Sequence, residues 1–101
     1  MAHVTHFKLR AKPGERDDVI GMFDRWQSER QPRAKGYVRS ILTSSLTDSS
    51  EFMAGVMFDS KASYDANSND PAQHKWYQEL RSHLAADPEW FDGTLEREFS
   101  A

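Results

Sequence analysis

The chain has 101 residues, a formal net charge of −3 and no cysteine. This length fits a single domain spanning residues 1–101 with one core, and the lack of cysteine excludes disulfides, thiolate metal sites and a thiol nucleophile. The chain has no basic stripe, no long apolar run and no secretory signal pattern, so we expect a cytoplasmic protein that binds neither nucleic acid nor membrane.

The first two elements are predicted to be a strand and a helix. Residues 2–10 alternate as in a β-strand, with Phe7 and Leu9 on one face and His6 on the other. A long apolar stripe at helical spacing predicts a helix over 15–31, which Pro32 ends. The stripe comprises Val19, Ile20, Phe23, Trp26 and Arg30. We expect the Arg30 stem to lie on apolar surface while its head reaches water.

Two further strands follow, joined by a polar turn. Residues 37–46 alternate after Gly36, and residues 51–59 are apolar on both faces. Because residues 51–59 are apolar on both faces, we expect this strand at the centre of the sheet and buried on both sides.

The last third of the chain predicts two helices and a fourth strand. Ser60 can cap a short helix through Asn67. Asp70 and Pro71 then start a helix over 71–86, where Gln73 completes a capping box and is therefore not assigned to a pocket. Residues 90–99 are predicted to form the final strand.

The element order is β-α-β-β-α-β, which predicts an α+β, ferredoxin-like fold with a four-stranded antiparallel sheet. Two helices cover one face of such a sheet and leave the other open. That open face would carry apolar groups, either Met53 and Met57 or else Phe52, Val56 and Phe58. A monomer rarely exposes such a patch, so we expect a homodimer that pairs two sheets face to face.

Four strings of the sequence resemble the antibiotic biosynthesis monooxygenase family, whose fold is the dimeric α+β barrel. They are PGERDDVIGMFDRW, KGYVRSILTSS, EFMAGVMFDSKASYDAN and DPAQHKWYQEL. The most characteristic pieces are Lys12-Pro13-Gly14, Lys35-Gly36 and the run from Phe58 to Lys61 that leads into Tyr64. These pieces are landmarks of the fold more than of its chemistry.

The resemblance implies a range of activities. Some family members are cofactor-free oxygenases of polycyclic phenols, and others oxidise quinols, degrade haem or have no known activity. The expectation is therefore a cofactor-independent monooxygenase acting on an aromatic phenol, quinol or polyketide-like substrate. The alternative is a non-catalytic ligand-binding or stress-related dimer.

Haem degradation is the least favoured of these activities. Haem-degrading members use an Asn on the first strand, with a Trp and a His on the second helical region. This sequence has Phe7, Asn67 and Tyr77 at the matching positions. None of the three agrees, although His74 lies one turn before Tyr77.

The helix over 71–86 carries the catalytic candidates. At about 100° per residue, His74, Tyr77 and Arg81 form one edge beside the apolar stripe. In a functional interpretation Arg81 stabilises an anionic oxygen while Tyr77 or His74 exchanges a proton. In the ordinary interpretation the same edge is a solvated amphipathic boundary.

Four further side chains are candidates for ligand binding. The Asn67 amide can hydrogen-bond a carbonyl, although Asn is also a common helix-ending residue. Trp26 and Trp76 are either walls of a pocket or core, and His6 is either an isolated base or a boundary histidine. The histidines lack metal-binding spacing, because residues three apart on a strand face opposite sides, so neither a metal site nor a cofactor is expected.

Overall fold

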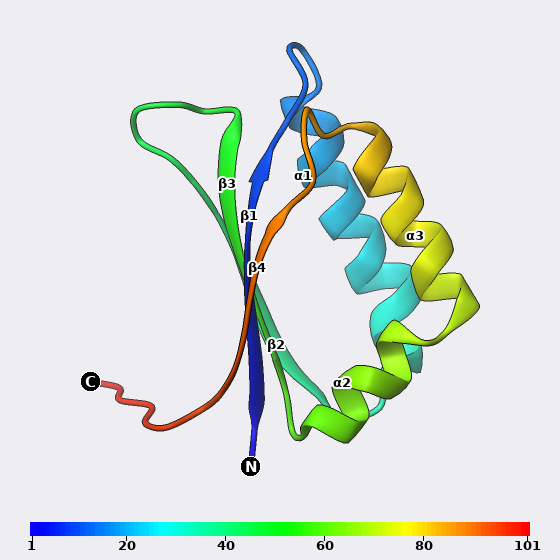
Figure 1. Ribbon diagram of the computed structural model, residues 1–101, viewed down its shortest axis with the longest axis vertical. Helices are drawn as coiled ribbons and strands as arrows, with labels where there is room; N and C mark the ends of the chain where they lie inside the picture. The colour runs from blue at the N-terminus through cyan, green and yellow to red at the C-terminus, as the bar shows by residue number, and fades with distance from the viewer.

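The computed structural model describes residues 1–101 as one sheet with all helices on one of its faces (Figure 1). The strands are β1 (His3–Arg10), β2 (Tyr37–Ser44), β3 (Glu51–Phe58) and β4 (Glu89–Thr94). The helices are α1 (Arg16–Arg25), α2 (Lys61–Ser68) and α3 (Pro71–Ser82). The predicted order is confirmed, with α2 and α3 as the two pieces of the second helical region.

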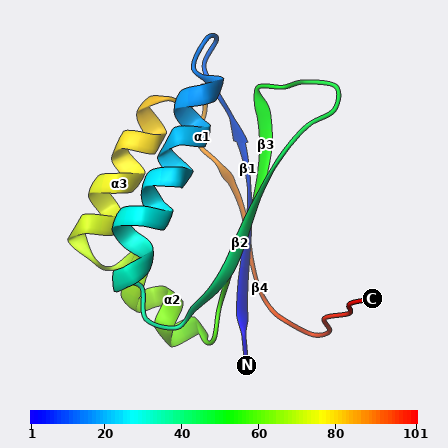
Figure 2. The ribbon, with the colours of Figure 1, turned by 180° about the vertical axis from the view of Figure 1, so that it is seen from behind.

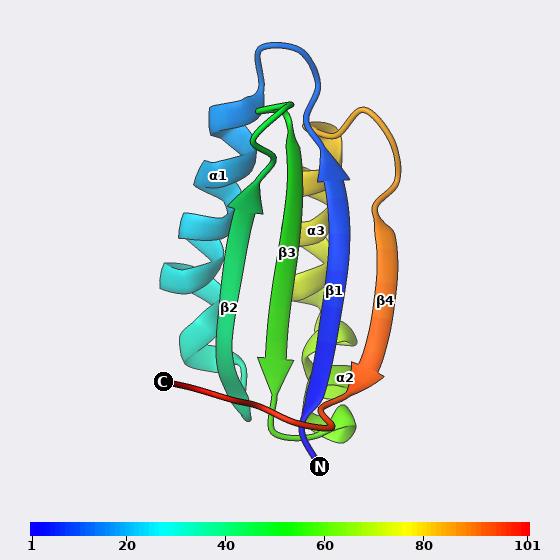
Figure 3. The same cartoon turned by 90° about the vertical axis from the view of Figure 1, so that its left-hand side faces the viewer.

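The sheet is antiparallel with the order β2-β3-β1-β4, as Figure 3 shows from its open side. This is the ferredoxin-like arrangement predicted from the sequence, and β3 lies centrally as expected. Phe7 of β1 pairs with Ala54 of β3 and with Trp90 of β4. Successive residues of a strand face opposite sides, so this register turns Phe7, Ala54 and Trp90 toward the helices.

The core lies between the sheet and the helices. Its apolar members come from both the sheet and the helical layer, and each is less than a tenth exposed. They are Phe7, Leu9, Ala11, Val19, Met22, Trp26, Ala34, Phe52, Ala54, Phe58, Trp76, Leu80 and Leu84. The β1 face predicted to be apolar is therefore the buried one.

A polar link ties the edge strand β4 to this core. The buried Thr5 donates its hydroxyl proton to Asp92 Oδ1 at 2.6 Å, and His3 Nε2 lies 2.9 Å from the same hydroxyl. Because Thr5 has one proton and gives it to Asp92, His3 Nε2 must be the donor to Thr5. These hydrogen bonds provide partners for the buried side chains of His3 and Thr5, and the His3 ring lies against that of Tyr64.

The helix predicted over 15–31 is present but changes its winding near its end. After Arg25 it continues as one π-helical turn, η1 (Trp26–Arg30), and a short 3-10 turn, η2 (Gln31–Arg33). Pro32 lies inside η2, and the helical region ends at Arg33, two residues later than predicted. Turns of the π type are rare and often occur at functional sites.

The helix predicted over 71–86 was placed too long, because it ends at Ser82. Leu84 forms an isolated bridge with Ala11, and the Ala85 N–H donates to the Arg10 carbonyl. These bonds pull the chain onto the end of β1. The helix therefore stops for a long-range reason that its own sequence does not carry.

The final strand is also shorter than the predicted 90–99. It ends at Thr94, and one further bond just outside both strands runs from the Leu95 N–H to the Ala2 carbonyl. Residues 95–101 then leave on the side of the sheet opposite the helices (Figure 2). The strand predicted over 37–46 likewise ends at Ser44, where the turn to β3 begins.

No helix covers the outer sheet face; only the C-terminal segment crosses one end of it, where Glu98 pairs with Arg39 (Figure 3). Gly55, His6 and Ile41 lie side by side on it, and Met53 and Phe91 expose much of their surface there. The burial of β3 on both sides that the sequence predicted is therefore not provided by this chain alone.

Candidate functional site

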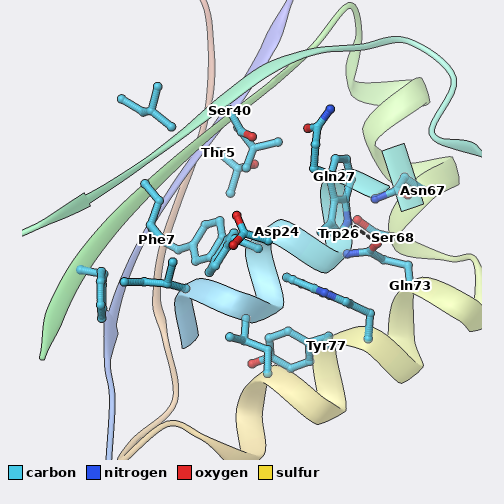
Figure 4. A pocket seen from close by; sticks show the side chains of 18 of the residues that line it. Thr5, Phe7, Asp24, Trp26, Gln27, Ser40, Asn67, Ser68, Gln73 and Tyr77 are labelled. Atoms are coloured by element: carbon cyan, nitrogen blue, oxygen red, sulfur yellow. Dashed lines mark hydrogen bonds between the residues drawn. The ribbon is translucent and has the colours of Figure 1, made fainter. Parts of the chain in front are cut away.

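A cavity of about 720 Å³ separates the inner face of the sheet from the helices. This volume suits a drug-sized ligand. Nine aromatic side chains from both layers are among the 24 residues that line it; Figure 4 labels Phe7, Trp26 and Tyr77 of these. The nine are Phe7, Phe23, Phe52, Phe58, Trp26, Trp76, Trp90, Tyr64 and Tyr77.

Several of these rings are held in place by their neighbours. Phe23 meets Trp76 edge to face at 5.7 Å, and Phe7 lies 4.7 Å from Trp90 between ring centroids. The Trp76 indole N–H donates to the Met22 carbonyl at 2.8 Å. The wall is therefore largely preformed, which lowers the ordering cost of binding a flat ligand.

One end of the cavity is polar and is built around two amide side chains. Gln73 Oε1 accepts from Trp26 Nε1 at 2.8 Å and from Arg30 Nε at 3.3 Å. Asn67 Oδ1 accepts from the other arm of Arg30 at 3.1 Å. Asn67 and Gln73 both line the cavity, near Trp26 in Figure 4.

Tyr77 lines the cavity from α3, where its ring lies 6.1 Å from that of Trp90. Burial raises the pKa of its hydroxyl above the usual value, the negative charge of Asp87 raises it further, and Arg81 lowers it in part. Tyr77 is therefore a neutral phenol at physiological pH, suited to donate a hydrogen bond and not to act as a resting base.

The alkaline titration of tyrosine tests this environment. Since burial favours the neutral phenol, Tyr77 should ionise above the usual value of about 10. In a Tyr77→Phe variant the tyrosinate absorbance should lose a component that appears above that pH. The Tyr77 contribution to stability is present below about pH 10 and falls as pH rises through the higher folded pKa, because the unfolded chain ionises first.

A comparison of unfolding at neutral and alkaline pH completes this test. The wild type should lose more stability than Tyr77→Phe between the two conditions. Equal losses would contradict the buried environment of Tyr77.

The structure brings together five of the seven residues singled out from the sequence. His74, Tyr77, Asn67, Trp26 and Trp76 all line the cavity. Of these, His74 is exposed and lies at the rim, whereas both Trp side chains are buried. The Trp side chains thus belong to the core and to the cavity wall at once.

Arg81 and His6 do not join them, contrary to prediction. The Arg81 guanidinium turns to the end of α3, where Nε donates to Asp87 Oδ1 at 2.7 Å and another arm donates to the Leu84 carbonyl. His6 is on the outer face of the sheet, near Phe91. Strand alternation alone puts His6 on the far side from Phe7 and the cavity.

Two residues were missed as parts of the site. Gln73 does not form the predicted capping box, because the Asp70 N–H donates to the Asn67 carbonyl and the Gln73 amide turns into the cavity. Its position on the apolar face of α3 was the available signal. Arg30 does not send its head to water as predicted; its side chain is 7% exposed and its guanidinium is bound by three side chains.

A separate polar cluster lies at the opposite end of α1. The ligand atoms of Glu15, Asp18 and His83 are within 4.8 Å of one another, and His83 Nδ1 is 2.8 Å from Glu15 Oε1. The spacing of these residues in the sequence does not reveal this proximity. A hydrogen bond between Glu15 and His83 accounts for their contact.

The fold and the cavity together define an α+β domain that encloses a ligand-sized space between sheet and helices. Solved structures with this fold include a mutant of SnoaB, a cofactor-independent oxygenase from Streptomyces nogalater. It is 14% identical, with a TM-score of 0.86 over 99% of this chain and 98% of that one.

Two candidate antibiotic biosynthesis monooxygenases share the fold as well. The protein from Chloroflexus aurantiacus is 19% identical, with a TM-score of 0.74 over 99% of this chain and all of that one. The protein from Nitrosomonas europaea is 15% identical, with a TM-score of 0.80 over 94% and 90%. These similarities confirm the α+β, ferredoxin-like fold of the single chain.

Other comparisons add no relative. No family model matches the chain, and no curated protein matches it. None of the helices combines the length and the apolar character that crossing a membrane requires.

Proposed function

We propose that this protein is a cofactor-independent monooxygenase that acts on an aromatic phenol, quinol or polyketide-like substrate. The observation that carries this proposal is the cavity of about 720 Å³ whose aromatic walls converge on the amides of Asn67 and Gln73. Its similarity in fold to an oxygenase that works without a cofactor supports the same function.

In this reaction the protein needs only to bind the substrate and to stabilise the charge that develops on it. Ionising the substrate hydroxyl makes the ring electron-rich enough to pass one electron to oxygen, and the two radicals then combine. For a substrate methylene that becomes a carbonyl, one oxygen atom enters the product and the other leaves as water, so the substrate supplies all four electrons. Apolar walls that exclude water favour each charged step.

Four polar residues of the cavity have a role in this proposal. The amides of Asn67 and Gln73 stabilise the substrate oxyanion in place of the predicted Arg81. Tyr77 donates a hydrogen bond as a neutral phenol, in keeping with its raised pKa. His74, at the exposed rim, exchanges the proton with solvent.

Oxygen consumption tests the activity directly. The purified protein should consume oxygen above the buffer rate with at least one member of a panel of anthrones, hydroquinones and polycyclic phenols. Product mass should increase by the expected oxygen content. A panel-wide rate equal to that of buffer would count against the proposal.

A second candidate is a ligand-binding protein without catalysis. It is favoured by the neutral donors at the polar end of the cavity, which hold a ligand without removing its proton. A ligand of the panel that raises the melting temperature and is recovered unaltered would support this candidate. Product formation would exclude it.

We also propose that the protein is a homodimer joined through the outer sheet face. The exposed apolar residues Ile41, Met53 and Phe91 lie on this face, on strands β2, β3 and β4, with β1 between the last two. A face of this kind is normally covered in a soluble protein. A second copy placed by a two-fold axis covers it with an identical surface.

Sedimentation measures the oligomeric state. The wild type should sediment as a dimer, and the double variant Ile41→Lys with Phe91→Lys as a monomer, because two buried charges on each copy would go unpaired. The matched control is Leu46→Lys, which replaces an exposed apolar residue in the β2–β3 turn and off this face. A monomeric wild type, or an unchanged double variant, would contradict the dimer.

A further inference from the structure

A buried guanidinium organises the polar end of the cavity. Arg30, in the π-helical turn η1, has a side chain that is only 7% exposed. It donates to Asn67 at the end of α2, to Asp70 at the cap of α3 and to Gln73 in the first turn of α3. One side chain from the first helical region thus joins both pieces of the second.

This arrangement decides which way the two amides face. A guanidinium and an indole N–H are donors only. The oxygens of Asn67 and Gln73 must therefore point to Arg30 and Trp26, and their amide nitrogens point away from them. The structure has no fully buried side-chain nitrogen or oxygen without a partner. The two NH₂ groups, which have no partner within the protein, are therefore accessible from the cavity that both residues line.

We propose that Arg30 is a positioning residue that presents Asn67 and Gln73 as a pair of hydrogen-bond donors, so that this wall selects a ligand edge carrying acceptor oxygens, either a carbonyl or an ionised phenol. A neutral hydroxyl needs an acceptor for its proton, and the donor pair offers none. The inference takes from the proposed function only that the ligand is an oxygenated aromatic molecule.

The charge of Arg30 is held in place by Asp70. The pKa of the Asp70 carboxyl is lowered, first by the hydrogen bond from the Ala72 N–H and also by Arg30, so Asp70 remains ionised at neutral pH. A lysine cannot replace this contact set, because one ammonium lacks the planar fork that reaches several acceptors at once.

Other titratable groups also face the cavity and must be separated from the effect of the donor pair. They are Arg16 and Asp24 of α1, Tyr64 of α2, and His74 and Tyr77 of α3. A test based on the ionisation of a bound dye therefore needs a variant that changes the amide pair and a control that changes only the charge of the cavity.

The test uses alizarin, a hydroxyanthraquinone whose colour reports its ionisation. In the wild type, bound alizarin should ionise at a pH lower than that of the free dye, by about one unit, a tenfold change in its ionisation constant. Arg30→Lys and Arg30→Met should still bind the dye but lose most of this shift. Circular dichroism shows whether these variants keep the fold.

A second variant keeps the test decisive where loss of Arg30 impairs folding. Gln73→Glu retains acceptors for Arg30 and Trp26 but removes the amide donor, so the bound dye should ionise at a higher pH than in the wild type. The matched control is Gln27→Glu, which adds the same charge at a cavity residue that Arg30 does not contact. Gln27→Glu should retain most of the wild-type shift.

Three outcomes would overturn the inference: an unshifted or unbound dye in the wild type, a full shift in Arg30→Lys, or equal effects of Gln73→Glu and Gln27→Glu. The result is independent of turnover. A shifted dye without oxygen consumption would support the donor pair and contradict the proposed function. Oxygen consumption with an unshifted dye would support the proposed function and contradict the donor pair.

Discussion

Replacing Asn67 by Ala should lower the oxygenation rate of an accepted substrate by a factor on the order of 10²–10³, the usual cost of losing one oxyanion donor. The Asn67 amide oxygen is bound by Arg30, so the group lost to the substrate is a donor. The loss should appear mainly in kcat, because the donor is needed most when the substrate oxygen carries its charge. Steady-state oxygen consumption measures it.

The matched control for this variant is Asn69→Ala. Asn69 lies two residues further along, is exposed at the end of α2 and does not line the cavity. This variant should keep the wild-type rate. A similar rate loss in both variants would point to disturbance of the α2–α3 junction, and wild-type activity of Asn67→Ala would remove this residue from the mechanism.

The second large effect is expected at Gly36, just before β2. Its φ is +83°, a conformation that side chains disfavour, and a Cβ there would lie 2.6 Å from Ser63 Cβ. The left-handed backbone costs about 1–2 kcal/mol, and forcing an extra methyl into a packed site costs about 1–3 kcal/mol more. Gly36→Ala should therefore lower the free energy of unfolding by about 2–5 kcal/mol.

Gly14→Ala separates the two causes. Gly14 has nearly the same φ, +79°, but a Cβ there would meet no atom within 4 Å. The free energy of unfolding of this variant should fall only by the backbone contribution of about 1–2 kcal/mol. Chemical denaturation of both variants gives the difference, and equal losses would show that contact with Ser63 contributes nothing.

Local patterns predicted most of the fold correctly. The alternation around Phe7 and Leu9 identified the buried face of β1, and Ser60 caps α2 through the N–H of Ser63. These features depend on residues a few positions apart. Element ends were predicted less well where a distant strand decides them, as when Ala11 and Arg10 draw the chain off α3 after Ser82.

The residues of the candidate site were also predicted correctly only where the signal was local. The periodicity of α3 brought His74 and Tyr77 to the cavity, but its edge did not reveal that Arg81 turns to Asp87. Gln73 was explained by a capping box because that motif is local, whereas its partners Trp26 and Arg30 are more than forty positions away. Nothing in the spacing of these residues connects them.

The sequence by itself determined the order of strands and helices, the grouping of Phe7 and Leu9 on one face of β1, and the abundance of aromatic residues, because hydrophobic periodicity and capping act over a few residues. Only the tertiary structure decided the chemistry of the cavity. Arg30 lies on an apolar stripe that predicts an exposed head, yet packing brings it against the junction of α2 and α3. A buried cation there needs acceptors, and in taking the oxygens of Asn67 and Gln73 it leaves two donors for a ligand.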